Sequence, residues 1–129
     1  MKIWVNGCFD ILHRGHYELF NYAKSLGDTL VVGVDSDEKV AADKGPDRPY
    51  NKLEDRVYAL KSLKAIDDVW IFNTREGLKE QIKKYSPDIL VVGSDWKGKE
   101  VVGGHLAKKI VYFNRIGNYS TTNILSYDS

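Results

Sequence analysis

The stretch Asn6-Gly7-Cys8-Phe9-Asp10-Ile11-Leu12-His13-Arg14-Gly15-His16 joins a short apolar run, Lys2–Asn6, to an amphipathic segment that ends at Leu26. The apolar run is typical of a strand, and the spacing of apolar residues after it predicts a helix over Gly15–Leu26. Such a turn suits an anion, because the first N–H groups of a helix lack intrahelical partners and carry the positive end of its dipole. His13 and His16 would lie on one side of this helix start, and Gly15 leaves room for a ligand. The stretch therefore predicts a phosphate-binding turn.

Strands and helices are predicted to alternate along the rest of the chain. Apolar runs predict strands at Thr29–Asp35, Asp68–Asn73, Ile89–Gly93 and Ile110–Phe113, and helical spacing predicts helices over Asn51–Lys64, Arg75–Tyr85 and Ser120–Tyr127. We expect Gly27 to end the first helix in a left-handed conformation, and the polar segment Ser36–Tyr50 to be the longest loop. Near-continuous apolar strands are typical of a parallel sheet that is covered on both faces. The pattern predicts a single α/β domain over residues 1–129, with a Rossmann-like, doubly wound, parallel five-stranded sheet.

Composition excludes several classes of protein. The 19 basic and 18 acidic residues give a net charge of +1, which favours neither nucleic acid nor a membrane as a partner. No apolar run approaches the ~20 residues that a membrane span needs. The single cysteine, Cys8, and the absence of a signal-like N-terminus favour a cytoplasmic protein. Neither a dinucleotide-binding fingerprint nor a P-loop is present.

The His13-Arg14-Gly15-His16 motif, directly after Gly7-Cys8-Phe9-Asp10, resembles the His-x-Gly-His signature of the nucleotidylyltransferase superfamily. The resemblance implies that a substrate phosphate attacks the α-phosphorus of a nucleoside triphosphate and that pyrophosphate leaves. Mg²⁺ is expected to arrive on the triphosphate, and no metal-binding residues are assigned to the protein. Such a reaction needs positioning and positive charge, not a covalent nucleophile.

The resemblance assigns three sets of site residues. The catalytic set is His13, His16 and Lys44. The nucleotide-binding set is Gly7, Cys8, Phe9, Gly15, Asp95, Trp96, Arg115, Ser120, Thr121 and Thr122. The substrate-binding set is Asp10, Asp35 and Arg56.

Several of these residues have plain structural alternatives. Lys44 could be a solvated lysine, and Arg56 could pair with Asp55 or Glu54 on the surface. Cys8 could be a small buried residue, Trp96 a packing aromatic residue, and Ser120–Thr122 a simple helix cap.

Two branches of the superfamily fit the chain. Gly93–Lys99, Arg115 and Ser120–Thr122 resemble glycerol-3-phosphate cytidylyltransferase, although its Thr-Glu-Gly core is missing between Arg115 and Ser120. Arg48–Asn51 and Val101–Gly103, together with Asp55-Arg56, are similar to the adenylyltransferase domain that makes ADP-heptose.

We expect CTP and glycerol 3-phosphate as substrates, because Arg115 would lie nearest the base. The alternatives are transfer from ATP to a heptose 1-phosphate and a nucleotide-binding module without catalysis. A homodimer is expected, since cyclic dimers are the commonest oligomers.

Overall fold

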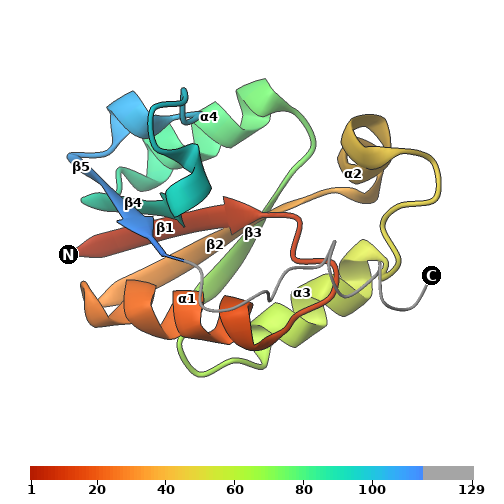
Figure 1. Ribbon diagram of the computed structural model, residues 1–129, viewed down its shortest axis with the longest axis horizontal. Coiled ribbons are helices and arrows are strands. Elements are labelled where there is room, and N and C mark those ends of the chain that lie inside the picture. Colours follow the sequence, from red (N-terminus) through yellow and green to blue (C-terminus); the bar gives the residue numbers. More distant parts are fainter. Residues whose placement is uncertain (115–129) are drawn as a thin grey trace.

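The computed structural model describes residues 1–114 and contains one parallel sheet of five strands (Figure 1). The strands are β1 (Lys2–Gly7), β2 (Thr29–Asp35), β3 (Asp68–Phe72), β4 (Ile89–Gly93) and β5 (Lys109–Phe113). They lie in the order β3-β2-β1-β4-β5, and every neighbouring pair is parallel. The predicted fold class, a Rossmann-like parallel sheet of five strands, is therefore confirmed.

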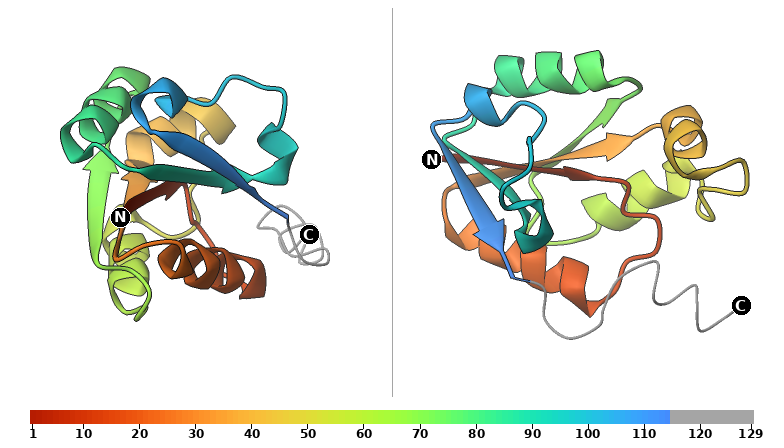
Figure 2. Two further views of the ribbon diagram at one scale, coloured as in Figure 1. Left: turned by 90° about the vertical axis from the view of Figure 1, so that its left-hand side faces the viewer. Right: turned by 45° about the horizontal axis from the view of Figure 1, so that its top comes forward.

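Helices cover both faces of the sheet. They are α1 (Arg14–Ser25), α2 (Asp37–Lys44), α3 (Leu53–Lys61) and α4 (Arg75–Tyr85), with short 3₁₀ turns η1 (Ser94–Trp96) and η2 (Gly104–Leu106). Helices α1 and α3 lie on one face and α4 on the other, while α2 stands beyond the end of β2 (Figures 1 and 2). No helix within residues 1–114 is long and apolar enough to cross a membrane.

The alternation of side chains along β1 divides the core into two layers. Ile3 and Val5 pack with the apolar residues of α1 and α3, whereas Trp4 belongs to the layer beneath α4. The Trp4 ring is fully buried and meets the rings of Trp70 and Tyr85 at centroid distances of 5.7 and 5.9 Å. Because both faces are covered, the central strands are almost continuously apolar in sequence.

Gly27 is required for a reason other than the predicted left-handed conformation, and that prediction is wrong. Among the glycines within residues 1–114, the positive φ angles belong to Gly45, Gly98 and Gly103, and not to Gly27. A Cβ on Gly27 would instead lie 2.5 Å from the carbonyl oxygen of Met1. The chain needs glycine here because two backbone segments approach each other closely.

The segment Ser36–Tyr50 is not the continuous loop that its polar composition predicted, because it contains α2. The Ser36 hydroxyl accepts a hydrogen bond from the Lys39 N–H at 3.2 Å, and two acidic residues, Asp37 and Glu38, occupy the first turn. The burial of Val40 attaches this short helix to the fold.

The next helix, α3, is shorter than predicted. It begins at Leu53 and not at Asn51, because the backbone of Lys52 is still extended, and it ends at Lys61. The helix predicted over Ser120–Tyr127 lies outside the described residues.

Candidate active site

A cavity of about 510 Å³ opens at the carboxyl ends of β1 and β4, where the strand order reverses. This switch point is where open α/β sheets bind their ligands. The predicted site residues that line it are Gly7, Cys8, Phe9, Asp10, His13, Gly15, His16, Asp35, Lys44, Asp95 and Trp96. The structure thus brings together residues from four separate segments of the sequence. Arg115 and Ser120–Thr122 lie outside the described residues.

His13 and His16 form a stacked pair at the start of α1. The Nδ1 atom of His13 accepts the Gly15 N–H at 3.0 Å, and the Nδ1 atom of His16 accepts the His13 N–H at 3.2 Å. The two ring centroids are 3.9 Å apart. A ring nitrogen that accepts a hydrogen bond carries no proton, so this network assigns the hydrogen of each neutral ring to Nε2. The local capping of the helix therefore fixes both rings as Nε2–H donors.

The buried Phe9 ring packs against His16 from the core. Phe9 has a left-handed backbone, with φ at 49°, and its ring is buried in the core. The ring meets His16 edge-on at 5.6 Å and Phe20 at 5.1 Å. A Cβ on Gly7 would lie 2.9 Å from the Phe9 ring, so Gly7 is needed for the ring to fold back over the strand. Phe9 and Gly7 therefore position the motif from the protein side of the cavity.

Asp10 holds the segment that precedes α3. Its carboxylate, 1% exposed, accepts the N–H groups of Tyr50 and Asn51 at 2.8 Å each, and the Arg48 Nε atom at 3.3 Å. The Asn51 side-chain amide donates to the Asp10 carbonyl at 2.6 Å. These partners come from the protein itself, so Asp10 positions the segment before α3, and its predicted contact with substrate stays a prediction.

Arg56 is also buried within the protein and does not line the cavity, contrary to its predicted role as a phosphate ligand. Its side chain is 0% exposed. Its guanidinium donates to the carbonyl oxygens of Asn51, Cys8 and Asp35 at 2.8–3.0 Å, and to the Asp37 carboxylate at 2.8 Å. Arg56 therefore ties together the segments after β1 and β2 and the start of α2. The predicted alternative, a surface ion pair, is equally wrong.

Charged side chains of β2 and α2 form the rim of the cavity. Lys39 Nζ lies 2.6 Å from the Asp43 carboxylate and 3.7 Å from that of Asp35, and Lys44 stands beside them in the cavity wall. Burial raises the pKa of Asp35, although the Lys39 charge opposes the shift. Burial works to lower the pKa of Lys39, but the hydrogen bond to Asp43 and the charge of Asp35 outweigh it, so that this pKa is raised.

Lys39 and Asp43 are not among the residues predicted from the sequence. Their i, i+4 spacing becomes a contact only if residues 37–44 form a helix. The signal for that helix was present, since Ser36 is followed by two acidic residues, as in a capped first turn.

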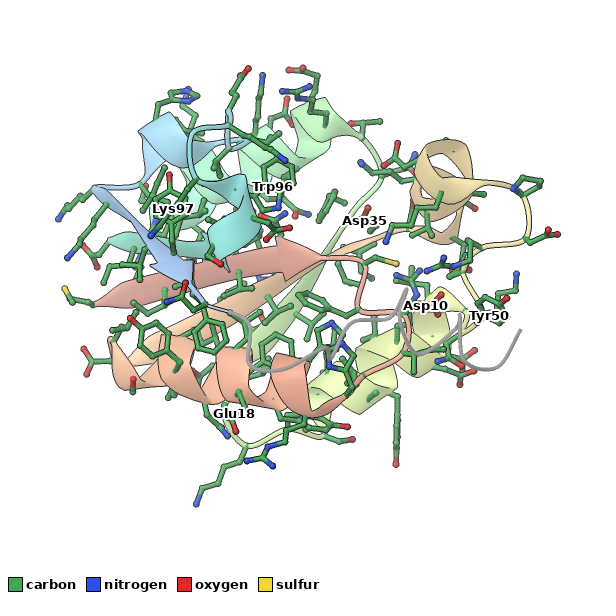
Figure 3. All side chains as sticks on the ribbon, in the orientation of Figure 1. Asp10, Glu18, Asp35, Tyr50, Trp96 and Lys97 are labelled. Atoms are coloured by element: carbon green, nitrogen blue, oxygen red, sulfur yellow. The ribbon has the colours of Figure 1, made fainter. Side chains whose placement is uncertain are left out.

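Cys8 and Trp96 also line the cavity. Burial raises the pKa of the Cys8 thiol, against the charges of Lys44 and Arg56, so the thiol is a poor nucleophile at neutral pH. Trp96, in η1, is 46% exposed. Figure 3 shows Asp35 near the end of the sheet, with Trp96 on the α4 side and Asp10 on the α3 side.

The family model described as "Cytidylyltransferase-like" matches residues 4–125. The chain belongs to this family. By that membership it is a nucleotidyltransferase domain, as the histidine motif predicted.

Among curated proteins, the chain is 50% identical over 123 residues to the bifunctional protein HldE of a Nitratiruptor species. It is 44% identical to HldE of Helicobacter hepaticus and 43% identical to that of Helicobacter pylori. Each match covers 95% of this chain but only 25–26% of the relative. The chain therefore spans about a quarter of the length of the curated relatives it matches.

Solved structures agree on the fold. The lipopolysaccharide core biosynthesis protein of Thermoplasma volcanium superposes with a TM-score of 0.71 and 27% identity, covering 93% of this chain and 98% of that one. Pantoate-beta-alanine ligase of Francisella tularensis, at 16% identity and a TM-score of 0.60, shares the fold alone; the match covers 98% of this chain and 68% of that one. The expected preference for CTP and glycerol 3-phosphate finds no support here, and the relatives favour the alternative branch.

Proposed function

We propose that this domain transfers AMP from ATP to a heptose 1-phosphate, yielding ADP-heptose and pyrophosphate. The observation that carries the proposal is 50% identity, over 95% of the chain, to HldE. The C-terminal domain of HldE is the ADP-heptose adenylyltransferase. Within this family the choice of nucleotide and acceptor differs between branches, and sequence identity at this level supports a shared choice more strongly than a single residue such as Arg115.

Two segments that resemble the adenylyltransferase branch are linked to the cavity. The segment Arg48–Asn51 is bonded to Asp10, which lines the cavity, and Val101 and Val102 line it directly. Gly103, with φ at 74°, lies so near α4 that a Cβ would be 2.6 Å from the Ile82 side chain. The resemblance therefore includes segments that shape the site, and this supports the assignment.

In the proposed reaction, an oxygen of the sugar phosphate forms a bond to the α-phosphorus of ATP. The bond from that phosphorus to the oxygen leading to the β-phosphorus breaks, and pyrophosphate leaves with the electron pair. His13 and His16 donate from Nε2 to the phosphate oxygens on which charge accumulates. Lys44 neutralises part of that charge, and the N–H groups of the first turn of α1 add their dipoles.

Mg²⁺ enters this proposal with the nucleotide. The ion neutralises phosphate charge and prefers oxygen ligands, which the triphosphate itself supplies. Within residues 1–114, no three side chains of His, Cys, Asp or Glu gather in a way that could hold a metal. We therefore assign no protein ligand to the ion.

The test is pyrophosphate release from purified protein with Mg²⁺, crossing ATP and CTP against heptose 1-phosphate and glycerol 3-phosphate. Release with ATP and heptose 1-phosphate alone is the expected result, and His16→Ala serves as the inactive control. Release with CTP and glycerol 3-phosphate would restore the cytidylyltransferase branch. Tight triphosphate binding without release in any combination would indicate a module that binds nucleotide without catalysis.

A further inference from the structure

A second hollow, of about 700 Å³, lies between α2, the start of α4 and η1. Its own lining is polar and includes Glu38, Asn73, Arg75 and Glu100. It borders the first cavity, and the residues that line both are Lys39, Asp43, Leu78, Trp96 and Val102. The two hollows are therefore neighbours, and of these two only the first is lined by the histidine motif.

The residues that line both hollows include a partly buried cation. The Lys39 side chain is 19% exposed and lies between two carboxylates, Asp43 at 2.6 Å and Asp35 at 3.7 Å. Its Nζ atom also lies 5.8 Å from the centre of the Phe72 ring. Asp43 is the more exposed of the two carboxylates, at 52% against 13% for Asp35. A phosphate arriving at the junction could therefore replace Asp43 as the partner of Lys39 without exposing the lysine to water.

We propose that the second hollow holds the carbon skeleton of the phosphorylated sugar and that Lys39 binds its phosphate at the junction. This inference rests on the proposed function, because it assumes that a phosphorylated acceptor reacts with a nucleotide in the first cavity. The attacking phosphate must reach the α-phosphorus while the rest of the acceptor stays out of the nucleotide's space. The junction between the two hollows is the place that meets both needs, and Lys39 supplies the positive charge there.

The chemistry of the hollow suits a polyhydroxylated ligand. Glu38 and Glu100 offer carboxylate oxygens that accept hydrogen bonds from hydroxyl groups, and the Asn73 amide can both donate and accept. The exposed Trp96 ring offers an apolar face to the C–H groups of a sugar. Arg75 also lines the hollow and lies 3.7 Å from the Glu100 carboxylate. The hollow therefore offers both donors and acceptors of hydrogen bonds to the hydroxyl groups of a sugar.

The pair Lys39 and Asp43 gives a test with opposite expected signs. Lys39→Met removes the phosphate ligand, and loss of one charge-assisted hydrogen bond corresponds to roughly a ten- to hundredfold rise in the KM for heptose 1-phosphate. Asp43→Asn removes the competing carboxylate, so the same KM should stay constant or fall. The KM for ATP should change little in either variant, and Lys39→Arg should restore most of the acceptor affinity.

A purely structural role of Lys39 predicts something else. If Lys39 only fastens α2 through Asp43, then Asp43→Asn and Lys39→Met should impair the protein in the same direction, and this result would overturn the inference. An unchanged acceptor KM in Lys39→Met would overturn it as well. Circular dichroism verifies folding, and Lys39→Gln replaces the methionine variant if that one fails to fold.

Calorimetric titration of heptose 1-phosphate, in the presence of a non-hydrolysable ATP analogue, separates this inference from the proposed function. Binding that weakens in Lys39→Met, together with absent pyrophosphate release, would mean that the function fails while the subsite stands. Normal release with equal binding to both proteins would mean that the function stands and the subsite is wrong. Absence of binding to the wild type would overturn the inference.

Discussion

The His16 ring accepts the backbone N–H of His13 through Nδ1, at 3.2 Å, while the two rings stack with centroids 3.9 Å apart. The same nitrogen that caps the helix thus fixes the tautomer that the proposed chemistry needs. In the proposed mechanism, capping uses Nδ1 and catalysis uses Nε2 of the same ring. A substitution of His16 can therefore separate them if it preserves only one of the two nitrogens.

His16→Asn places an amide oxygen near the position of Nδ1 and offers nothing at Nε2, whereas His16→Gln can place an N–H donor near Nε2. We expect His16→Asn to retain most of the thermal stability and to lose about 10²–10³ in kcat, the effect of removing one preorganised donor. His16→Ala should lose activity and also about 0.5–2 kcal/mol of stability, because the cap is lost. Fixed-time pyrophosphate assays measure the loss of kcat, and thermal melts measure the loss of stability. Full activity in His16→Asn would show that Nε2 is not a catalytic donor.

Lys44, in the last turn of α2, should act mainly in the transition state. Lys44→Met is expected to lower kcat by on the order of 10²-fold and to change the KM for ATP much less. Lys39→Met, on the same helix, is the matched comparison, since it should act on the KM for the acceptor. A Lys44→Met variant with a raised KM for ATP and a normal kcat would mean that Lys44 contributes uniform binding instead.

Arg56 should prove to be a stability residue. Arg56→Met leaves the Asp37 carboxylate and three carbonyl oxygens without their donor, and we expect a loss of about 3–5 kcal/mol in the free energy of unfolding by urea. Arg14→Met is the control, because Arg14 is 69% exposed and pairs with Glu18 on the surface, which is worth at most about 0.5 kcal/mol. Unchanged stability with a weakened affinity for the acceptor would restore Arg56 as a phosphate ligand.

The raised pKa of Asp35 gives a pH dependence with a defined sign. Because the folded protein holds this proton more tightly than the unfolded chain, the stabilising contribution is complete below the ordinary pKa of 3.8 and is lost as the pH rises through the raised value. Asp35→Asn should therefore gain stability relative to the wild type as the pH rises above the ordinary pKa of 3.8 and through the raised value. Urea unfolding of both proteins across this range measures the difference. A difference that is constant with pH would contradict the assigned shift.

Much of the fold could be predicted because its elements carry local signals. The apolar runs of the strands and the stripes at Phe20 and Ala23, or at Leu78 and Ile82, follow from periodicity, and all four of these side chains are buried. The helix α2 was missed because it is short and buries little more than Val40, so that polar composition dominated the pattern. The reason for Gly27 was predicted wrongly. The close approach of Met1 is a tertiary contact, which the spacing of residues in the sequence cannot reveal.

The site was predictable where it is local and unpredictable where it depends on distant partners. The histidine motif and its turn lie within a few residues of each other. Residue type and spacing were therefore enough to predict that they share one turn at the start of a helix. Asp10 and Arg56 are residue types that often bind ligands. Their hydrogen-bond partners here, which include Cys8 and Asn51, belong to other parts of the same chain. A buried arginine that joins loops and an exposed one that binds phosphate have the same sequence signature. Lys39 was missed for the converse reason, since its place at a junction depends on how α2 packs.

The most direct test of the central claim is a competition in one reaction. Equal concentrations of ATP and CTP, with Mg²⁺ and heptose 1-phosphate, are incubated with the protein, and the nucleotide sugars are identified by mass spectrometry. The account predicts ADP-heptose as the product, with pyrophosphate in equal amount and neither formed by His16→Asn. Accumulation of a CDP-linked product, or of no nucleotide sugar, would contradict it.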